Sequence, residues 1–242
     1  MRRALLAGCL AMLGAFARPG VAAADDFPKA AIQTVKMSVA QIECVVSVQP
    51  GLDTGGMGAS GTAFFINRAG VFVTADHVIV KMRSLGPQCN PSLVLPHGGW
   101  QNEETPSGLR AIFPFDPASC DEDHDDDIAA CGLSVNPFAT ASVEDAIRPV
   151  TFASGDQSDG SEVAFTGFPD GYSWPITARG SIASTTPVNT LPTLTIDGLS
   201  WRGMSGSPVF SRSGDVVGML VGAENGDAAG LSVARPARLV LA

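Results

Sequence analysis

Short apolar or alternating runs, each ended by a turn-forming residue, recur along most of the chain. Runs of this length bounded by Gly, Pro, Asn, Asp or Ser predict β-strands. About a dozen strands at this spacing are typical of a β-sandwich or a β-barrel. The predicted strands cover residues 42–48, 62–67, 71–74, 93–95, 109–115, 128–133, 150–153, 162–165, 176–181, 193–196, 208–210, 216–221 and 231–233.

Helical periodicity is weak in comparison. No long stretch repeats its apolar positions every 3.6 residues, and only residues 30–39 and 236–242 favour short helices. The 27 Gly and 17 Pro among 242 residues exceed the average share of these turn formers. The sequence therefore predicts an all-β protein.

The composition and charge exclude several classes of protein. Hydrophobic residues make up 45% and charged residues 16%, which is enough apolar material to rule out intrinsic disorder. The 24 Asp and Glu outnumber the 15 Lys and Arg, for a formal charge of −9. A surface this acidic argues against nucleic-acid binding and against a polybasic membrane patch.

The first 24 residues have the composition of a signal peptide. Arg2 and Arg3 form a basic start, residues 4–16 are uncharged and mostly apolar, and residues 21–24 read VAAA before the expected cleavage. No later stretch reaches the roughly 18 apolar residues of a membrane-spanning helix. We expect a mature protein of residues 25–242, exported to the periplasm or the exterior.

Cysteine usage agrees with export. The mature chain contains Cys44, Cys89, Cys120 and Cys131, an even number that predicts two disulfides in an oxidising compartment. Sequence alone permits three pairings, of which we favour Cys44–Cys89 with Cys120–Cys131. A zinc site is less well supported, because the chain has no CxxC pair.

Histidine-based chemistry has few candidates. His77 ends the apolar run 71–78, which predicts that a strand holds it on a rigid support. His97 lies in a Pro-Gly-rich turn and His124 in the acidic run 121–127. We interpret His97 and His124 as surface or structural residues, and the acidic run as an exposed loop.

A candidate nucleophile lies in the run GMSGSP at 203–208. A serine hydroxyl needs a base to take its proton and backbone N–H groups to stabilise the oxyanion. Gly203 would let its own N–H and that of Ser205 converge on that oxyanion, although an ordinary Gly/Ser/Pro turn reads the same way. Asp127, at the start of an apolar strand, could orient a histidine, or could simply end a solvated loop.

The order of these three candidates along the chain is more specific than any one of them. It runs His77, Asp127, Ser205. The α/β-hydrolase order is excluded because no histidine follows Ser205. The subtilisin order would need an acidic motif before His77 and an α/β pattern, and the sequence shows neither. The chain also lacks the HExxH motif of a zinc protease.

Six motifs in this order resemble the trypsin-like (chymotrypsin-fold) serine proteases, in particular their bacterial exported branch. They are SGTAF at 60–64, TADH at 74–77, DIA at 127–129, TGFP at 166–169, GMSGSP at 203–208 and GDVVG at 214–218. HtrA-type proteases share much of the pattern, but we expect no PDZ domain because the sequence leaves no room for one. Glutamyl endopeptidases are also similar, but they carry a histidine where this chain reads GMLVG at 218–222.

The resemblance implies two six-stranded antiparallel β-barrels, at about 38–135 and 148–236 of a single protease domain, with the active site between them. It implies Ser205 as nucleophile, His77 as general base and then acid, and Asp127 as the carboxylate that orients His77. The N–H groups of Gly203 and Ser205 would form the oxyanion hole. No cofactor is implied, the partner is a protein or peptide substrate, and we expect a monomer.

The resemblance also implies a pocket for the substrate side chain, with Leu199 as its floor and Met219, Leu220 and Val221 as one wall. This apolar lining predicts a preference for uncharged side chains. Two alternatives remain open from the sequence. The chain could be a catalytically inactive relative that uses the fold for binding, or a protease with calcium bound by residues 121–126.

Overall fold

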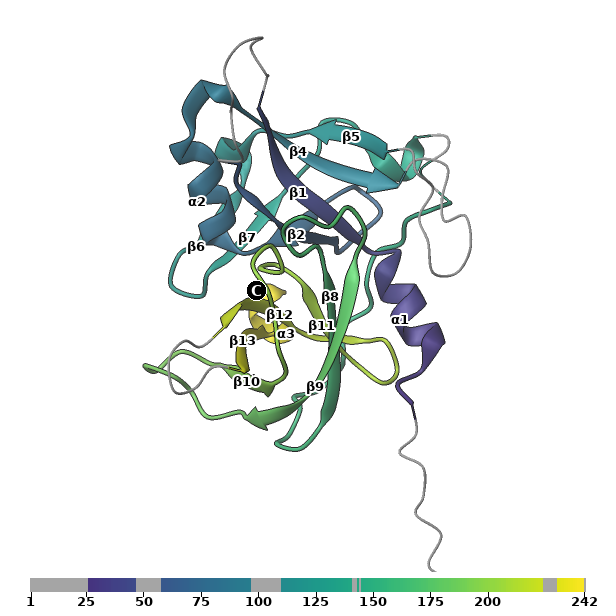
Figure 1. Cartoon of the computed structure of the whole chain (residues 1–242), viewed down its shortest axis with the longest axis vertical. Helices are drawn as coiled ribbons and strands as arrows, with labels where there is room; N and C mark the ends of the chain where they lie inside the picture. The colour runs from purple at the N-terminus through teal and green to yellow at the C-terminus, as the bar shows by residue number, and fades with distance from the viewer. Residues whose placement is uncertain are drawn as a thin grey trace, which may run out of the picture.

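The computed structural model describes residues 26–46, 58–96, 110–140, 143, 145–223 and 230–241. The predicted signal peptide and His97 lie outside these residues. Two β units lie one above the other in Figure 1. The first is a seven-stranded sheet of order β5-β4-β1-β2-β3-β7-β6. Its strands are β1 (Val39–Val46), β2 (Ser60–Phe65), β3 (Phe72–Thr74), β4 (Cys89–Pro96), β5 (Arg110–Pro114), β6 (Asp121–Asp123) and β7 (Ile128–Cys131).

The second unit is a closed six-stranded barrel of order β10-β13-β12-β11-β8-β9. Neighbouring strands in both units pair antiparallel. The predicted strand at 150–153 is not formed; Phe152 makes only an isolated bridge to Val216. The strands are β8 (Glu162–Gly167), β9 (Ile176–Ser184), β10 (Leu194–Asp197), β11 (Pro208–Ser211), β12 (Val216–Ala223) and β13 (Leu231–Pro236).

Helices are short and flank the strands. The helix α1 (Lys29–Lys36) overlaps the favoured segment 30–39, and α3 (Ala237–Val240) lies inside the favoured segment 236–242. The helix α2 (Asp76–Ser84) was not expected from the sequence. Single 3-10 turns cover Gly86–Gln88, Pro117–Ser119 and Pro137–Ala139. No helix in the described segments is long and apolar enough to cross a membrane.

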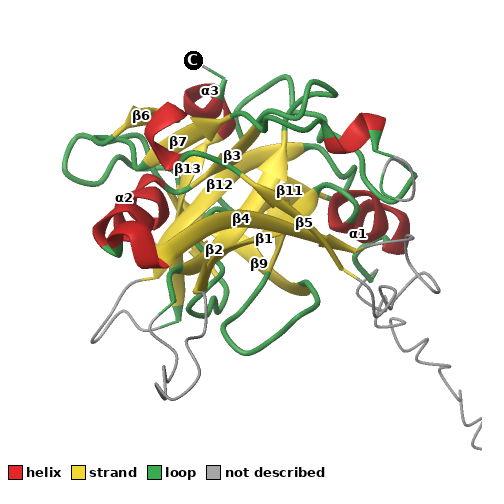
Figure 2. Ribbon diagram, turned by 90° about the horizontal axis from the view of Figure 1, so that it is seen from above, coloured by secondary structure: helices red, strands yellow, loops and turns green. Residues whose placement is uncertain are grey.

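Three apolar clusters hold the units together. One fills the first unit, where Val78, Ile79 and Met82 of α2 pack on the sheet, and another fills the second barrel. The third lies between the units and also takes in α1, on the opposite side of the strands from α2 (Figure 2). Adjacent residues of a strand face opposite sides, so in β2 Phe65 enters the first core while Phe64 enters the cluster between the units.

Both predicted disulfides are confirmed. Cys44 of β1 pairs with Cys89 of β4, with their Cα atoms 5.1 Å apart. Cys120 pairs with Cys131 of β7 across 4.3 Å. Because the second bridge closes the hairpin β6–β7, it fixes the segment that carries Asp127.

One buried hydroxyl beside Ser205 predicts a simple route to higher stability. Ser207 is fully buried, and its Oγ has no hydrogen-bond partner among the described residues. Burying an unpaired hydroxyl costs about 1–3 kcal/mol. Ser207→Ala should therefore raise the free energy of unfolding by about 1 kcal/mol and Tm by roughly 2–4 °C in calorimetry.

Ser232→Ala is the matched control, because the equally buried Ser232 hydroxyl donates to Gly198 O at 2.6 Å. That variant should lose stability by about 1 kcal/mol. Equal losses in the two variants would contradict the interpretation of Ser207.

Candidate active site

His77 lies in the first turn of a helix rather than at the end of a strand. The strand β3 stops at Thr74, Ala75 is extended at φ −71° and ψ 136°, and α2 starts at Asp76. The expectation that His77 stands at a strand end is therefore wrong, because the strand ends three residues earlier. The buried side chains of α2 still give His77 a rigid support, while its own side chain is 50% exposed.

Asp127 lies directly opposite His77. His77 Nδ1 is 2.8 Å from Asp127 Oδ2 and 3.1 Å from Oδ1, and Oδ1 also accepts a hydrogen bond from the backbone N–H of His77 at 2.8 Å. The backbone of Asp127 is left-handed, with φ 56°, a conformation that Asp and Asn adopt more readily than other non-glycine residues. A carboxylate facing Nδ1 makes that nitrogen the donor, which leaves Nε2 of the neutral ring as an acceptor.

This geometry shifts the titration of the imidazole. The hydrogen bond that His77 Nδ1 donates to Asp127 raises the pKa of His77 above its usual 6.5. Partial burial opposes that shift, and the negative charges of Asp127 and then Asp76 reinforce it. The protonated imidazolium is therefore stabilised at this position, as a base that must hold a proton transiently requires.

A second Asp–His pair joins the same two segments. In this pair α2 supplies the Asp and the acidic run supplies the His, the reverse of His77–Asp127. His124 Nδ1 is 2.7 Å from Oδ2 of the buried Asp76. Arg83 of α2 also pairs with Glu122, whose side chain is only 9% exposed. The acidic run 121–127 is thus not simply a solvated loop: it forms β6 and a turn, and two ion pairs besides His77–Asp127 attach it to α2.

The same residues bear on the calcium alternative. Asp76, Glu122 and His124 each offer a ligand atom, and these atoms lie within 4.8 Å of one another. Arg83 already pairs with Glu122 and His124 with Asp76, so these carboxylates have cationic or donor partners within the chain. The predicted ligand set 121–126 is not what converges here, since Asp76 comes from α2.

Ser205 lies in a tight turn between two glycines, whose backbone conformations other residues adopt only with strain. Gly203 has φ 88° and Gly206 has φ 87°. A Cβ on Gly206 would overlap Thr62 O and lie 3.1 Å from the backbone N of Ala75. The turn is therefore packed directly against the segment that leads into His77. Within the described residues, the Ser205 hydroxyl has no hydrogen-bond partner.

Thr62 of β2 holds this turn across the interface between the units, and sequence reasoning missed it. Its backbone N–H donates to Ser205 O at 2.9 Å, and its hydroxyl donates to Gly203 O at 3.0 Å. The same hydroxyl accepts from the N–H of Phe168 at 2.8 Å. A threonine in an apolar strand carries no sequence feature that would distinguish this role.

The predicted specificity pocket is not assembled as expected. Leu199 is 56% exposed, which does not suit a pocket floor. Met219 and Leu220 are fully buried, in the cluster between the units and in the barrel core respectively. Adjacent strand residues face opposite sides, so these two cannot share one pocket wall. Of the predicted wall, only Val221 is partly exposed.

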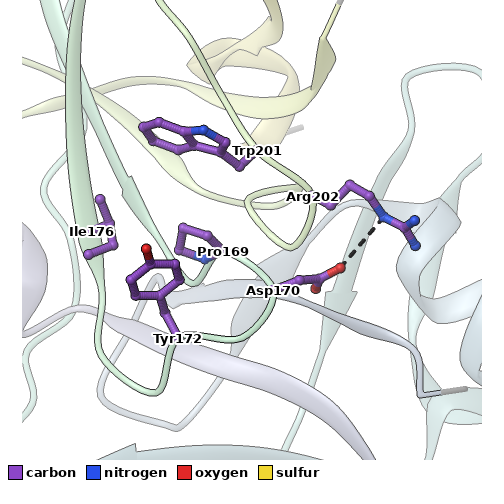
Figure 3. A pocket seen from close by; sticks show the side chains of 6 residues that line it. All are labelled: Pro169, Asp170, Tyr172, Ile176, Trp201 and Arg202. Atoms are coloured by element: carbon purple, nitrogen blue, oxygen red, sulfur yellow. Dashed lines mark ion pairs between the residues drawn. The ribbon is translucent and has the colours of Figure 1, made fainter. Parts of the chain in front are cut away.

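An open pocket of about 460 Å³ has a different lining, which includes the two residues before Gly203 (Figure 3). Its lining comes from the segment after β8, the start of β9 and the two residues before Gly203. The lining residues are Pro169, Asp170, Tyr172, Ile176, Trp201 and Arg202.

Solved structures share this fold. The crystal structure of Deg5 is 18% identical with a TM-score of 0.64, covering 88% of this chain and 89% of that one. The active form of the Rv3671c protease from M. tuberculosis is 21% identical with a TM-score of 0.60, covering 96% and 92%. The HtrA-type protease AlgW with a tripeptide is 16% identical with a TM-score of 0.61, covering 88% of this chain and 61% of that one. These similarities show the two-barrel, chymotrypsin-like fold.

A family match adds to the fold. No curated protein matches the sequence. Residues 61–219, about two thirds of the chain, match the family model of the trypsin-like peptidase domain. That match spans the strand of Thr62, the pair His77–Asp127 and the turn of Ser205. The chain therefore belongs to the trypsin-like peptidases.

Proposed function

We propose that this protein is an exported serine endopeptidase that hydrolyses peptide bonds through an acyl-enzyme. The family and its fold support a serine protease. The observation that carries the finer proposal is the 2.8 Å contact between His77 Nδ1 and Asp127, made on the segment against which the Ser205 turn packs. The mature enzyme would comprise residues 25–242 as one domain.

In the proposed first step, Ser205 Oγ attacks the carbonyl carbon of the substrate while His77 Nε2 takes the hydroxyl proton. Asp127 accepts a hydrogen bond from Nδ1 throughout and stabilises the imidazolium. The N–H groups of Gly203 and Ser205 would donate to the oxyanion of the tetrahedral intermediate. When the intermediate collapses, His77 gives its proton to the leaving amine and Ser205 stays acylated.

In the second step a water molecule replaces the amine. His77 takes a proton from the water, the hydroxide attacks the acyl carbon, and the acid product leaves as the proton returns to Ser205 Oγ. All the proton transfers use side chains of the protein, so the proposal needs no cofactor.

Export is supported by the pattern of residues 1–24 and by the two disulfides, Cys44–Cys89 and Cys120–Cys131. Disulfides persist in oxidising compartments such as the periplasm and the exterior. Both would therefore be expected to form after translocation.

Labelling with a fluorophosphonate tests the proposed activity directly. The reagent should modify one serine of the folded protein, and peptide mapping should place the adduct on Ser205. The Ser205→Ala variant should take up no label. A folded wild-type protein that neither labels nor hydrolyses a mixed peptide substrate would instead be the inactive binding relative.

The raised pKa of His77 predicts the pH dependence of catalysis. A protonated imidazole cannot accept the serine proton, so kcat/KM should fall as the pH drops through the pKa of His77. Because Asp127 raises that pKa, the midpoint of the acid limb should lie above 6.5. A profile of kcat/KM from pH 5 to pH 9 measures it.

The limb should persist in the His124→Gln variant, because His124 contacts Asp76 and not the proposed reacting atoms. Loss of the acid limb in that variant would show that the limb belongs to His124 and not to His77.

A further inference from the structure

The pocket in Figure 3 concentrates the rarest side chains of the chain. The protein has one Tyr and three Trp. Tyr172 and Trp201 line the pocket together with Pro169 and Ile176, and these four side chains surround a common space. Trp174 packs edge-on against Tyr172, with ring centroids 5.6 Å apart. The tyrosine and two of the tryptophans thus gather at one surface site.

These aromatic side chains are unusually exposed. Tyr172 and Trp201 are each 46% exposed and Trp174 is 49% exposed. Exposed aromatic area contributes free energy when an apolar group covers it, and Trp and Tyr dominate binding energy at recognition sites. A cavity of about 460 Å³ is within the usual size of a small binding pocket.

One hydrogen bond joins the pocket to the Ser205 turn, and another joins two segments of its lining. The N–H of Met204 donates to Trp201 O at 3.1 Å, and the N–H of Asp170 donates to Arg202 O at 2.8 Å. Trp201 is only four residues before Ser205 along the chain. An extended peptide advances about 3.3 Å per residue, so a peptide bound at Ser205 can place a nearby side chain in the pocket.

The charged groups at the pocket pair with each other. Arg202 Nε lies 3.5 Å from Asp170 Oδ2, drawn as the dashed line in Figure 3, and Asp170 Oδ1 accepts from Ser60 Oγ at 2.5 Å. The rest of the lining is mainly apolar. A charged substrate side chain would lose its hydration there without an unpaired partner of opposite charge.

We infer that this pocket binds an aromatic or large aliphatic side chain of the peptide substrate and so sets the sequence preference of the enzyme. The inference rests on the proposed protease function. It assigns specificity to Trp201, Tyr172 and Ile176 rather than to the side chains predicted from the sequence. Trp201 forms one wall and Tyr172 and Ile176 the facing wall (Figure 3).

Cleavage of a peptide library tests the inference. Wild type should prefer Phe, Trp or Leu at one fixed distance from the cleaved bond. Trp201→Ala should lower kcat/KM by roughly tenfold for those peptides and leave peptides with Ala at that position nearly unchanged. The control is Ile112→Ala, which truncates a side chain that is 55% exposed on β5 of the other unit and should not alter the preference.

Calorimetric titration of Ser205→Ala with an uncleaved aromatic peptide separates the pocket from the chemistry. Its Kd should rise about tenfold when Trp201→Ala is added. An equal loss for all peptides, or an unchanged preference and Kd, would overturn the inference. If the wild-type protein binds the aromatic peptide but is never labelled by fluorophosphonate, the proposed function is overturned and the pocket assignment stands.

Discussion

Replacing Ser205 with alanine should lower kcat for peptide hydrolysis by roughly six orders of magnitude, to the level left by substrate binding and the oxyanion hole. The reason is chemical, because no other hydroxyl occupies the turn between Gly203 and Gly206 in the same position. Steady-state kinetics of wild type and variant on one peptide, with both enzyme concentrations taken from absorbance, measures the loss.

The fold of this variant should be unchanged. The turn is held by backbone contacts, from the N–H of Thr62 to Ser205 O and from the N–H of Gly206 to Leu220 O, and the substitution removes neither. The free energy of unfolding should therefore stay within about 0.5 kcal/mol of wild type. A variant that folds normally and still hydrolyses the peptide at the wild-type rate would remove Ser205 from the mechanism.

Asp127→Asn should lower kcat by roughly 10⁴-fold. The amide can present its NH₂ to His77 Nδ1, which favours the ring tautomer that has its proton on Nε2 and cannot act as the base. Asn tolerates the left-handed backbone of Asp127, at φ 56°, so the turn should keep its shape. Kinetics across the pH range separate this tautomer effect from a loss of structure.

Asp125→Asn is the control for charge. Asp125 belongs to the same acidic run and is exposed, and its backbone N–H bonds to Asp123 Oδ1. The substitution removes one negative charge two residues before Asp127 and leaves the His77–Asp127 contact in place, so kcat should change less than about twofold. If Asp125→Asn were as damaging as Asp127→Asn, general electrostatics rather than orientation would explain the effect.

Much of the fold can be predicted from the sequence because local patterns of apolar and turn-forming residues indicate its β-strands. Strands such as β8 and β12 are short apolar runs ended by glycine or polar residues, and their positions agree within a few residues. The even number of cysteines predicts two disulfides but permits three pairings, and the structure selects Cys44–Cys89 with Cys120–Cys131. The pair His77–Asp127 is expected from the family resemblance, because its motifs occur in the order of that family.

The helix α2 could not be predicted from the sequence, for a physical reason. Its buried residues Val78 and Ile79 follow β3 after only three intervening residues, so strand and helix look alike in the sequence over so few residues. The extra strand β6 escapes because its acidic residues have poor strand propensity. Pairing with β7 and the contact between Arg83 and Glu122 offset that.

The pocket could not be located from the sequence, because its walls come from distant segments. Tyr172 and Trp201 are 29 positions apart in the sequence, and only the packing of the two turns brings them together. The residues predicted for the pocket follow a family register, but the alternation of β12 turns Met219 and Leu220 into separate cores.

The position of α1 has a consequence for the order in which the protein folds. Phe27 packs edge-on against Phe210, with centroids 5.6 Å apart, and Ala31 and Val35 share their cluster with Val216 and Val240. The first helix in the described part of the chain thus packs against partners that are synthesised near the end of the chain. Closing so long a loop costs entropy before any contact compensates for it, which slows folding and leaves the apolar face of α1 uncovered until late. Docking of α1 should consequently be among the last events of folding, after each β unit has formed its own core.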